Sequence, residues 1–207
     1  MASMLIQNIK QKFLIDQSPT ILLIGDDPSL ISSDDFFHPI SALPSPLTTL
    51  LRYHYILQAK HLWNRFDLIY YMDADLDVKQ NIELNEIVPD EPNQYVVVRH
   101  FHEDICKDIH LENNPQSKAY VENIPNYYHA CFYGAYKQPF DDLMVYGNEM
   151  VNQDLKKRIV AKWFDESHFN KYMTDKNVKV IPGHVYAHPE RWNLDAKIIH
   201  GNSFTFE

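Results

Sequence analysis

Short apolar runs alternate along this chain with segments whose apolar residues recur at helical spacing. The apolar runs predict strands at 21–24, 67–72, 95–99, 127–135 and 178–181, and the periodic segments predict helices at 5–14, 47–62 and 140–162. The stretches 25–45 and 104–125 and the tail after Pro182 are expected to be loops. Strands that alternate with helices favour helices packed on a mixed, mainly parallel sheet, so the sequence predicts an α/β fold.

The length and composition indicate one domain. The chain has 207 residues, of which 45% are apolar, and it shows no repeat or linker that would divide it. A chain of this size buries roughly 70% of its unfolded surface, so it needs no disulfide or structural metal. Cys106 and Cys131 stand far apart and predict no disulfide framework. We therefore expect a single domain over residues 1–207, with residues 1–3 a cloning remnant and Met4 the native start.

The charge balance excludes several partners. The 19 Lys and Arg residues are outnumbered by 28 Asp and Glu residues, and the net charge of −9 repels nucleic-acid phosphates. No apolar run approaches the ~20 residues of a membrane span, and the first residues lack the features of a signal peptide. We therefore expect a soluble, cytoplasmic protein without a membrane span. Its 13% aromatic content is typical of proteins that hold sugars or bases.

Three acids directly follow the predicted strand at 67–72. They are Asp73, Asp75 and Asp77. Ligands of open α/β sheets bind at the carboxyl ends of strands, and hard oxygen ligands at positions i and i+2 suit Mg²⁺ or Mn²⁺, especially beside a diphosphate. Asp73 and Asp75 are therefore the candidate metal ligands, with a solvated acidic turn as the alternative.

Other metal sites fit the sequence less well. An EF-hand loop that began at Asp73 would need Gly and Glu where the chain has Val78 and Leu84, so that reading fails. An aspartyl phosphatase would have a Thr after the acids, which is absent. His100 and His102 could share a strand face and bind zinc, but no third and fourth ligand follow at the usual spacing, and ordinary loop histidines remain the alternative.

A second acidic pair lies among aromatic residues. Asp165 and Glu166 follow Trp163 and Phe164 at a predicted helix start. The simplest interpretation is helix capping, with Asp165 as the N-cap and Glu166 in the first turn. The alternative is that this pair, like the first, serves a ligand.

The whole segment 163–172 closely resembles a known signature. It reads Trp-Phe-Asp-Glu-Ser-His-Phe-Asn-Lys-Tyr and is similar to the Trp-His-Asp-Glu-Ser-His-Leu-Asn-Lys-Tyr string of the family 6 glycosyltransferases, which include the histo-blood-group A and B enzymes and the α1,3-galactosyltransferases. Segments 67–75, 115–120 and 127–134 resemble further motifs of that family in the same order. The resemblance runs from about Leu5 to Trp192.

This resemblance implies a fold, a reaction and its participants. The fold is a single Rossmann-like domain of the GT-A type. The reaction is retaining transfer of galactose or an N-acetylhexosamine from a UDP-sugar to a hydroxyl of a glycan or glycoconjugate acceptor, assisted by Mn²⁺ or Mg²⁺ on Asp73 and Asp75. A short form of this kind implies a bacterial or viral origin.

The resemblance also implies roles for individual residues. Glu166 would be the catalytic group that faces the anomeric carbon, Asp165 would hold sugar hydroxyls, and Trp163 would stack on the acceptor. The other implied substrate-binding residues are Arg52 beside the acids, Gln116 in the loop 115–120, His129, Ala130 and Cys131 beside C2 of the donor sugar, and Lys197 with His200 near the diphosphate. The His-Ala-Cys sequence of that window favours UDP-galactose over UDP-N-acetylgalactosamine.

Some positions depart from the family pattern. The family's first strand, which holds the uracil ring, is expected to be missing, and Phe164 replaces a histidine near the acceptor. The chain keeps both aspartates where short bacterial relatives have asparagines. A degenerate sugar- or nucleotide-binding module and a slow UDP-sugar hydrolase therefore remain alternatives.

Overall fold

The computed structural model describes residues 2–41, 43–100, 110–187 and 195–200. Its helices are α1 (Ala2–Lys12), η1 (Pro28–Leu30), α2 (Leu47–Leu50), α3 (Arg52–Gln58), α4 (Lys60–Trp63), α5 (Leu84–Ile87), α7 (Lys137–Lys156) and α8 (Phe164–Met173). Its strands are β1 (Leu22–Gly25), β2 (Phe36–Pro39), β3 (Leu68–Met72), β4 (Leu76–Val78), β5 (Tyr95–Arg99), β6 (Tyr128–Tyr136), β7 (Val178–Val180), β8 (Tyr186–Ala187) and β9 (Ile198–His200). Within these ranges no helix has the length and apolar character needed to cross a bilayer.

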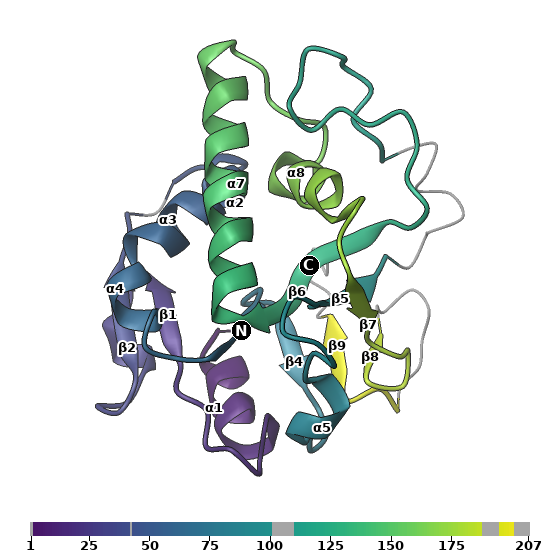
Figure 1. Cartoon of the computed structure of the whole chain (residues 1–207). Coiled ribbons are helices and arrows are strands. Elements are labelled where there is room, and N and C mark those ends of the chain that lie inside the picture. The colour runs from purple at the N-terminus through teal and green to yellow at the C-terminus, as the bar shows by residue number, and fades with distance from the viewer. Residues whose placement is uncertain (1, 42, 101–109, 188–194, 201–207) are drawn as a thin grey trace, which may run out of the picture.

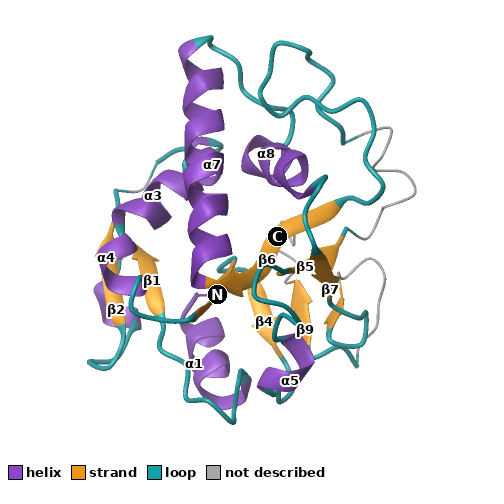
Figure 2. Ribbon diagram, viewed as in Figure 1, coloured by secondary structure: helices purple, strands orange, loops and turns teal. Residues whose placement is uncertain are grey.

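The central sheet has the strand order β3-β6-β5-β7. β6 runs antiparallel to both of its neighbours, whereas β5 and β7 are parallel. A parallel pair, β1-β2, and a three-stranded sheet, β4-β9-β8, complete the strands (Figure 2). The predicted α/β fold with a mixed sheet is confirmed, and the antiparallel pairings are contributed by β6 and by β9 with β4.

Apolar side chains of β5 alternate between two cores. Tyr95 and Val97 belong to the core beneath α3, α7 and α8, while Val96 and Val98 belong to the core on the side of α1 and α5. This is the two-residue period of a strand buried on both faces. Figure 1 shows α7 between α3 and α8. The sheet is therefore covered on both faces, and its site lies at the strand ends.

The register between β5 and β6 is interrupted. Val97 pairs with Tyr133, but the next residue, Val98, pairs with His129. Ala130 and Cys131 therefore have no partner on β5. Bulges of this kind occur next to active sites because they free backbone groups and re-aim side chains.

Several elements differ from the sequence-based expectation. The expected helix at 47–62 is divided into α2, α3 and α4, with Leu51 and Ala59 at the junctions in non-helical conformations. The expected loop at 25–45 contains β2, and the expected irregular tail contains β8 and β9. These strands have two to four residues each, and their pairing comes from tertiary contacts rather than from a visible pattern.

Gly147 allows close contact between α7 and α3. A Cβ atom at this position would lie 2.6 Å from the ring of Tyr53, which is 1% exposed and whose hydroxyl bonds the backbone oxygen of Asp165. At a solvent-exposed helix position, Gly→Ala would raise the free energy of unfolding by about 1 kcal/mol. Here we expect Gly147→Ala to destabilise the protein by about 1–2 kcal/mol in urea unfolding, because overpacking outweighs helix propensity.

Gly25→Ala is the matched control. Its added Cβ would meet nothing closer than 3.9 Å, so stability should change by less than about 0.5 kcal/mol. A Gly147→Ala protein more stable than the wild type would show that Tyr53 does not fill this contact.

Candidate active site

A buried arginine joins three elements of the fold. Arg52, the first residue of α3, contacts Asp73 Oδ1 through Nη2 at 2.9 Å and Asp165 Oδ2 through Nη1 at 2.9 Å. Nη1 also donates to the backbone oxygen of Ala130 at 2.8 Å. The end of β3, the start of α8 and the bulge of β6 are thereby held around one guanidinium group.

Asp73 is further fixed by its own strand and by β6. The Tyr71 hydroxyl donates to Asp73 Oδ1, and the Arg52 guanidinium lies 4.6 Å from the centre of the Tyr71 ring. The backbone N–H of Asp73 donates to the carbonyl of Cys131 at 2.9 Å. Burial raises the pKa of Asp73 even though Arg52 opposes that rise. The carboxyl group therefore lies where added positive charge would stabilise its ionised form.

The first turn of α8 brings the second acidic pair to the same place. Phe164 begins this helix with φ of 49°, a left-handed conformation that is costly for a bulky residue. The backbone N–H of Trp163 donates to Ser167 Oγ at 2.9 Å and closes the turn. Asp165 is not the N-cap, which is Trp163, so the capping interpretation of Asp165 is wrong.

Both carboxylate oxygens of Glu166 accept hydrogen bonds. Oε1 accepts from the Tyr127 hydroxyl and Oε2 from the Ala130 backbone N–H, each at 3.0 Å. The side chain is 15% exposed. Burial raises the pKa of Glu166 to about 7 and that of Asp165 to about 6, although hydrogen bonds to Glu166 and the charge of Arg52 near Asp165 oppose the shifts. The pair combines a fixed orientation with unusually basic carboxylates.

A small pocket of about 200 Å³ collects these groups. It is lined by Thr49, Arg52, Asp73, His100, His129, Ala130, Cys131, Trp163, Phe164, Asp165 and Glu166. Trp163 is 39% exposed and stacks on His110 with ring centroids 4.5 Å apart. An exposed aromatic face beside fixed carboxylates is an arrangement that suits a sugar ring.

A larger cavity of about 780 Å³ adjoins this pocket. It lies between α1, β1 and β3, is mostly apolar, and reaches Arg52, Asp73 and Ala74 at its polar end. β1 and β3 are only half-buried along their lengths. The strand before the acids is only partly buried because it borders the cavity.

Two predicted site residues lie elsewhere. Gln116 is exposed, and its backbone carbonyl accepts from Lys157 Nζ at 3.4 Å. Lys197 forms an ion pair with Glu86 on α5. Within the ranges that the structure describes, neither has a hydrogen bond or ion pair with the residues of the small pocket.

Sequence reasoning missed several side chains that build the pocket. They are Tyr71, Tyr127 and His110, together with Tyr53 and Asn170, whose hydrogen bonds hold the backbone of the two acidic residues. The position of Tyr71, two residues before Asp73 on the same strand, was an available signal. His100 lines the pocket, and its ring stacks on His129 with centroids 5.0 Å apart; its suggested zinc partner His102 lies outside the described residues.

The acids after β3 have the donor set of a hard divalent cation. Asp73 presents Oδ1 to Arg52 and Tyr71. Asp75 Oδ1 is buried without a hydrogen bond and has His200 Nε2 at 3.5 Å. A buried carboxylate oxygen that lacks a donor, next to a second carboxylate, fits Mg²⁺ or Mn²⁺. Asp77 differs, because it bonds Asn8 and pairs with Lys79.

The fold and the pocket together are those of an α/β protein that handles carbohydrate. The family model of glycosyltransferase family 6 matches residues 50–201, and this chain belongs to that family. It is 28% identical over 159 residues to the O-antigen biosynthesis glycosyltransferase WbnI of Escherichia coli, an alignment that covers 74% of this chain and 67% of the relative. Family membership makes the protein a transferase with a sugar donor and a glycan acceptor.

The raised pKa of Glu166 predicts a pH-dependent cost to stability. The ordinary value is 4.5 and the folded value about 7, so the folded state binds more protons between these limits and stability falls as pH rises through them. Glu166→Gln removes this cost, since the Tyr127 hydroxyl can accept from the amide while Ala130 donates to its oxygen. We expect the variant to be more stable than the wild type by about 3 kcal/mol at pH 8 and about equal at pH 4.5.

Urea unfolding at both pH values measures this difference. Glu149→Gln, on the exposed face of α7, is the control and should change stability equally little at each pH. If the difference in unfolding free energy between Glu166→Gln and the wild type were the same at pH 4.5 and pH 8, the raised pKa of Glu166 would be contradicted.

Proposed function

We propose that this protein transfers galactose or an N-acetylhexosamine from a UDP-sugar to a hydroxyl of a glycan acceptor with retention of the anomeric configuration. The observation that carries the proposal is the position of Glu166. Its carboxylate is held by Tyr127 and Ala130 in the pocket that also contains Asp73 and Arg52. A fixed, basic carboxylate beside a candidate cation site suits a reaction in which an anionic group leaves an anomeric carbon.

Glu166 has two chemical roles open to it in such a reaction. It can attack the anomeric carbon and form a glycosyl-enzyme bond, or it can stabilise an oxocarbenium-like centre while the acceptor enters on the leaving-group face. In both, the bond from the anomeric carbon to UDP breaks, a bond to the acceptor oxygen forms, and the proton of the acceptor hydroxyl passes to the departing diphosphate or to solvent. The high pKa of Glu166 favours both roles, because a more basic carboxylate is the better nucleophile and the stronger partner for positive charge.

Asp73 and Asp75 would hold the divalent cation. When bound, Mn²⁺ or Mg²⁺ neutralises charge on the departing diphosphate. Arg52 opposes the rise in the pKa of Asp73 and holds this carboxylate in place, and through Asp165 it links that acid to the start of α8. Asp165 is therefore suited to positioning the donor sugar rather than to attacking it.

The two hollows suggest places for the two substrates. The cavity between β1 and β3 opens at Arg52 and Asp73 and offers an apolar space for the nucleoside. Trp163, which lines the small pocket and is partly exposed, suits the acceptor. Cys131 lines the small pocket, but its Sγ lies 2.9 Å from the Tyr186 hydroxyl, so its influence on the donor must be measured.

The deciding experiment measures UDP release from UDP-galactose, UDP-N-acetylgalactosamine and UDP-N-acetylglucosamine with Mn²⁺, with and without glycan acceptors. Release that rises with an acceptor and gives a product of retained configuration supports the proposal. Release that ignores every acceptor indicates a hydrolase. Measurable donor binding without release indicates a binding module.

Glu166→Gln should lower kcat by at least two orders of magnitude and leave the Kd for UDP near the wild-type value. The substitution removes charge but hardly any volume, and UDP does not carry the sugar that Glu166 would face. Glu149→Gln should keep full activity. A Glu166→Gln enzyme with near-native kcat would reassign this residue to a structural role.

Activity should require Mn²⁺ or Mg²⁺ and stop in EDTA. Asp73→Asn and Asp75→Asn should each lose most activity because a carboxylate ligand becomes a weaker amide ligand. Asp77→Asn is the matched control from the same acidic cluster and should remain active, since its contacts are with Asn8 and Lys79. Full turnover in EDTA would refute the proposed metal role.

A further inference from the structure

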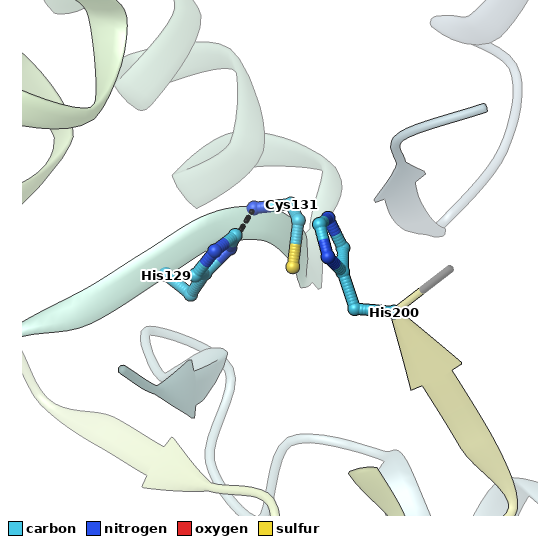
Figure 3. Close-up of side chains that lie close together, drawn as sticks. All are labelled: His129, Cys131 and His200. Atoms are coloured by element: carbon cyan, nitrogen blue, oxygen red, sulfur yellow. Dashed lines mark hydrogen bonds between the residues drawn. The ribbon is translucent and has the colours of Figure 1, made fainter. Parts of the chain in front are cut away.

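Three side chains of a softer ligand set converge beside the two acids. His129 and Cys131 lie on β6, and His200 is the last residue of β9. Their ligand atoms all lie within 4.8 Å of one another. Figure 3 shows the sulfur of Cys131 between the two imidazole rings. His129 and Cys131 lie 71 and 69 positions before His200 in the sequence, so the cluster is brought together by the fold and not by local sequence.

The strand pairings explain this convergence. The interruption of the β5-β6 register begins after His129, so Cys131 is turned out of the regular ladder. β9 pairs with β4 so that His200 lies opposite Leu76, the residue after Asp75. His200 Nε2 is consequently 3.5 Å from Asp75 Oδ1. A carboxylate oxygen thus borders the cluster on one side.

The chemistry of this donor set differs from that of Asp73 and Asp75. Thiolate and imidazole ligands favour Zn²⁺ over Mn²⁺ and Mg²⁺, and zinc takes four such ligands in tetrahedral geometry. Cys131 is 1% exposed, and the Tyr186 hydroxyl lies 2.9 Å from its sulfur. A hydroxyl in this position can donate to a metal-bound thiolate, as outer-shell partners of metal sites do.

We propose that His129, Cys131 and His200 form a Zn²⁺-binding site with three protein ligands, whose fourth position is open to water or another exogenous ligand. Binding exchanges the thiol proton of Cys131, which is released to solvent, for a zinc–sulfur bond. It also exchanges the long 3.3 Å hydrogen bond from the Cys131 N–H to His129 Nδ1 for a zinc–nitrogen bond. The site requires no sugar and no turnover, so it goes beyond the proposed function and does not rest on it.

Cobalt is the probe for this site. Co²⁺ takes the same ligands as Zn²⁺ and reports a bound thiolate by a charge-transfer band in the near ultraviolet and tetrahedral geometry by intense visible bands. One equivalent of Co²⁺ added to the reduced, tag-free protein should give both signals, and Zn²⁺ should abolish them.

Matched variants assign the signal to this cluster. Cys131→Ser should abolish the thiolate band, while Cys106→Ser, which changes the other cysteine, should retain it. His200→Gln should weaken Co²⁺ binding at least tenfold, while His61→Gln, an exposed histidine on α4, should not. If Cys131→Ser does not fold, His200→Gln decides, because His200 is the last residue of β9. Cobalt bound without a thiolate band, a band that persists in Cys131→Ser, or unchanged affinity in His200→Gln would overturn the proposal.

Discussion

The contact on which the site depends is the buried guanidinium of Arg52. It binds Asp73 and Asp165, and with them the end of β3 and the start of α8, to the backbone of β6. A lysine could not replace it, because a single ammonium lacks the planar fork that serves three acceptors in different directions. One cation nevertheless cannot neutralise two carboxylates, and Glu166 adds a third. Desolvation on burial is the main cause that raises the pKa of all three acids, and repulsion between neighbouring carboxylates adds to it. The proposed cation and the positive charge that would develop on the anomeric carbon in the proposed reaction would both be stabilised by this negative charge.

The irregular part of β6 supplies the backbone groups that the site uses. Where pairing with β5 is interrupted, the N–H of Ala130 donates to Glu166 and its carbonyl accepts from Arg52. In a regular ladder these groups would bond a neighbouring strand and could not orient side chains. The same irregularity turns Cys131 toward His200. The fold thus gives up sheet hydrogen bonds locally and recovers them as contacts that position the acids.

The sequence predicts most of the architecture and the clustering of both acidic pairs, and it fails where tertiary contacts decide. The apolar run 67–72 and the acids after it are a local signal, and β3 with Asp73 lies where this signal indicates. The short strands β2, β8 and β9 carry no comparable pattern, so the sequence predicts an irregular tail and gives no sign that His200 approaches Asp75. The direction of β6 was likewise hidden, because strand periodicity is the same in parallel and antiparallel sheets. Lys197, which the resemblance places near the diphosphate, forms its ion pair with Glu86 on α5, a tertiary contact that no local pattern indicates.

Some residues of the signature at 163–172 line the pocket, and others hold α8 in place. Asp165 and Glu166 line the pocket, whereas Asn170 bonds both the N–H and the carbonyl of Tyr128 and thereby fixes α8 against β6. His168 is 1% exposed and close to Asp154, and burial lowers its pKa to about 4, so it is a neutral packing residue rather than an acid–base group. A buried helix start with a left-handed first residue would be unstable without such support. Neighbouring residues that take no part in the proposed chemistry therefore stabilise the backbone that orients Glu166. This is why the pocket-lining and the supporting residues form one contiguous segment.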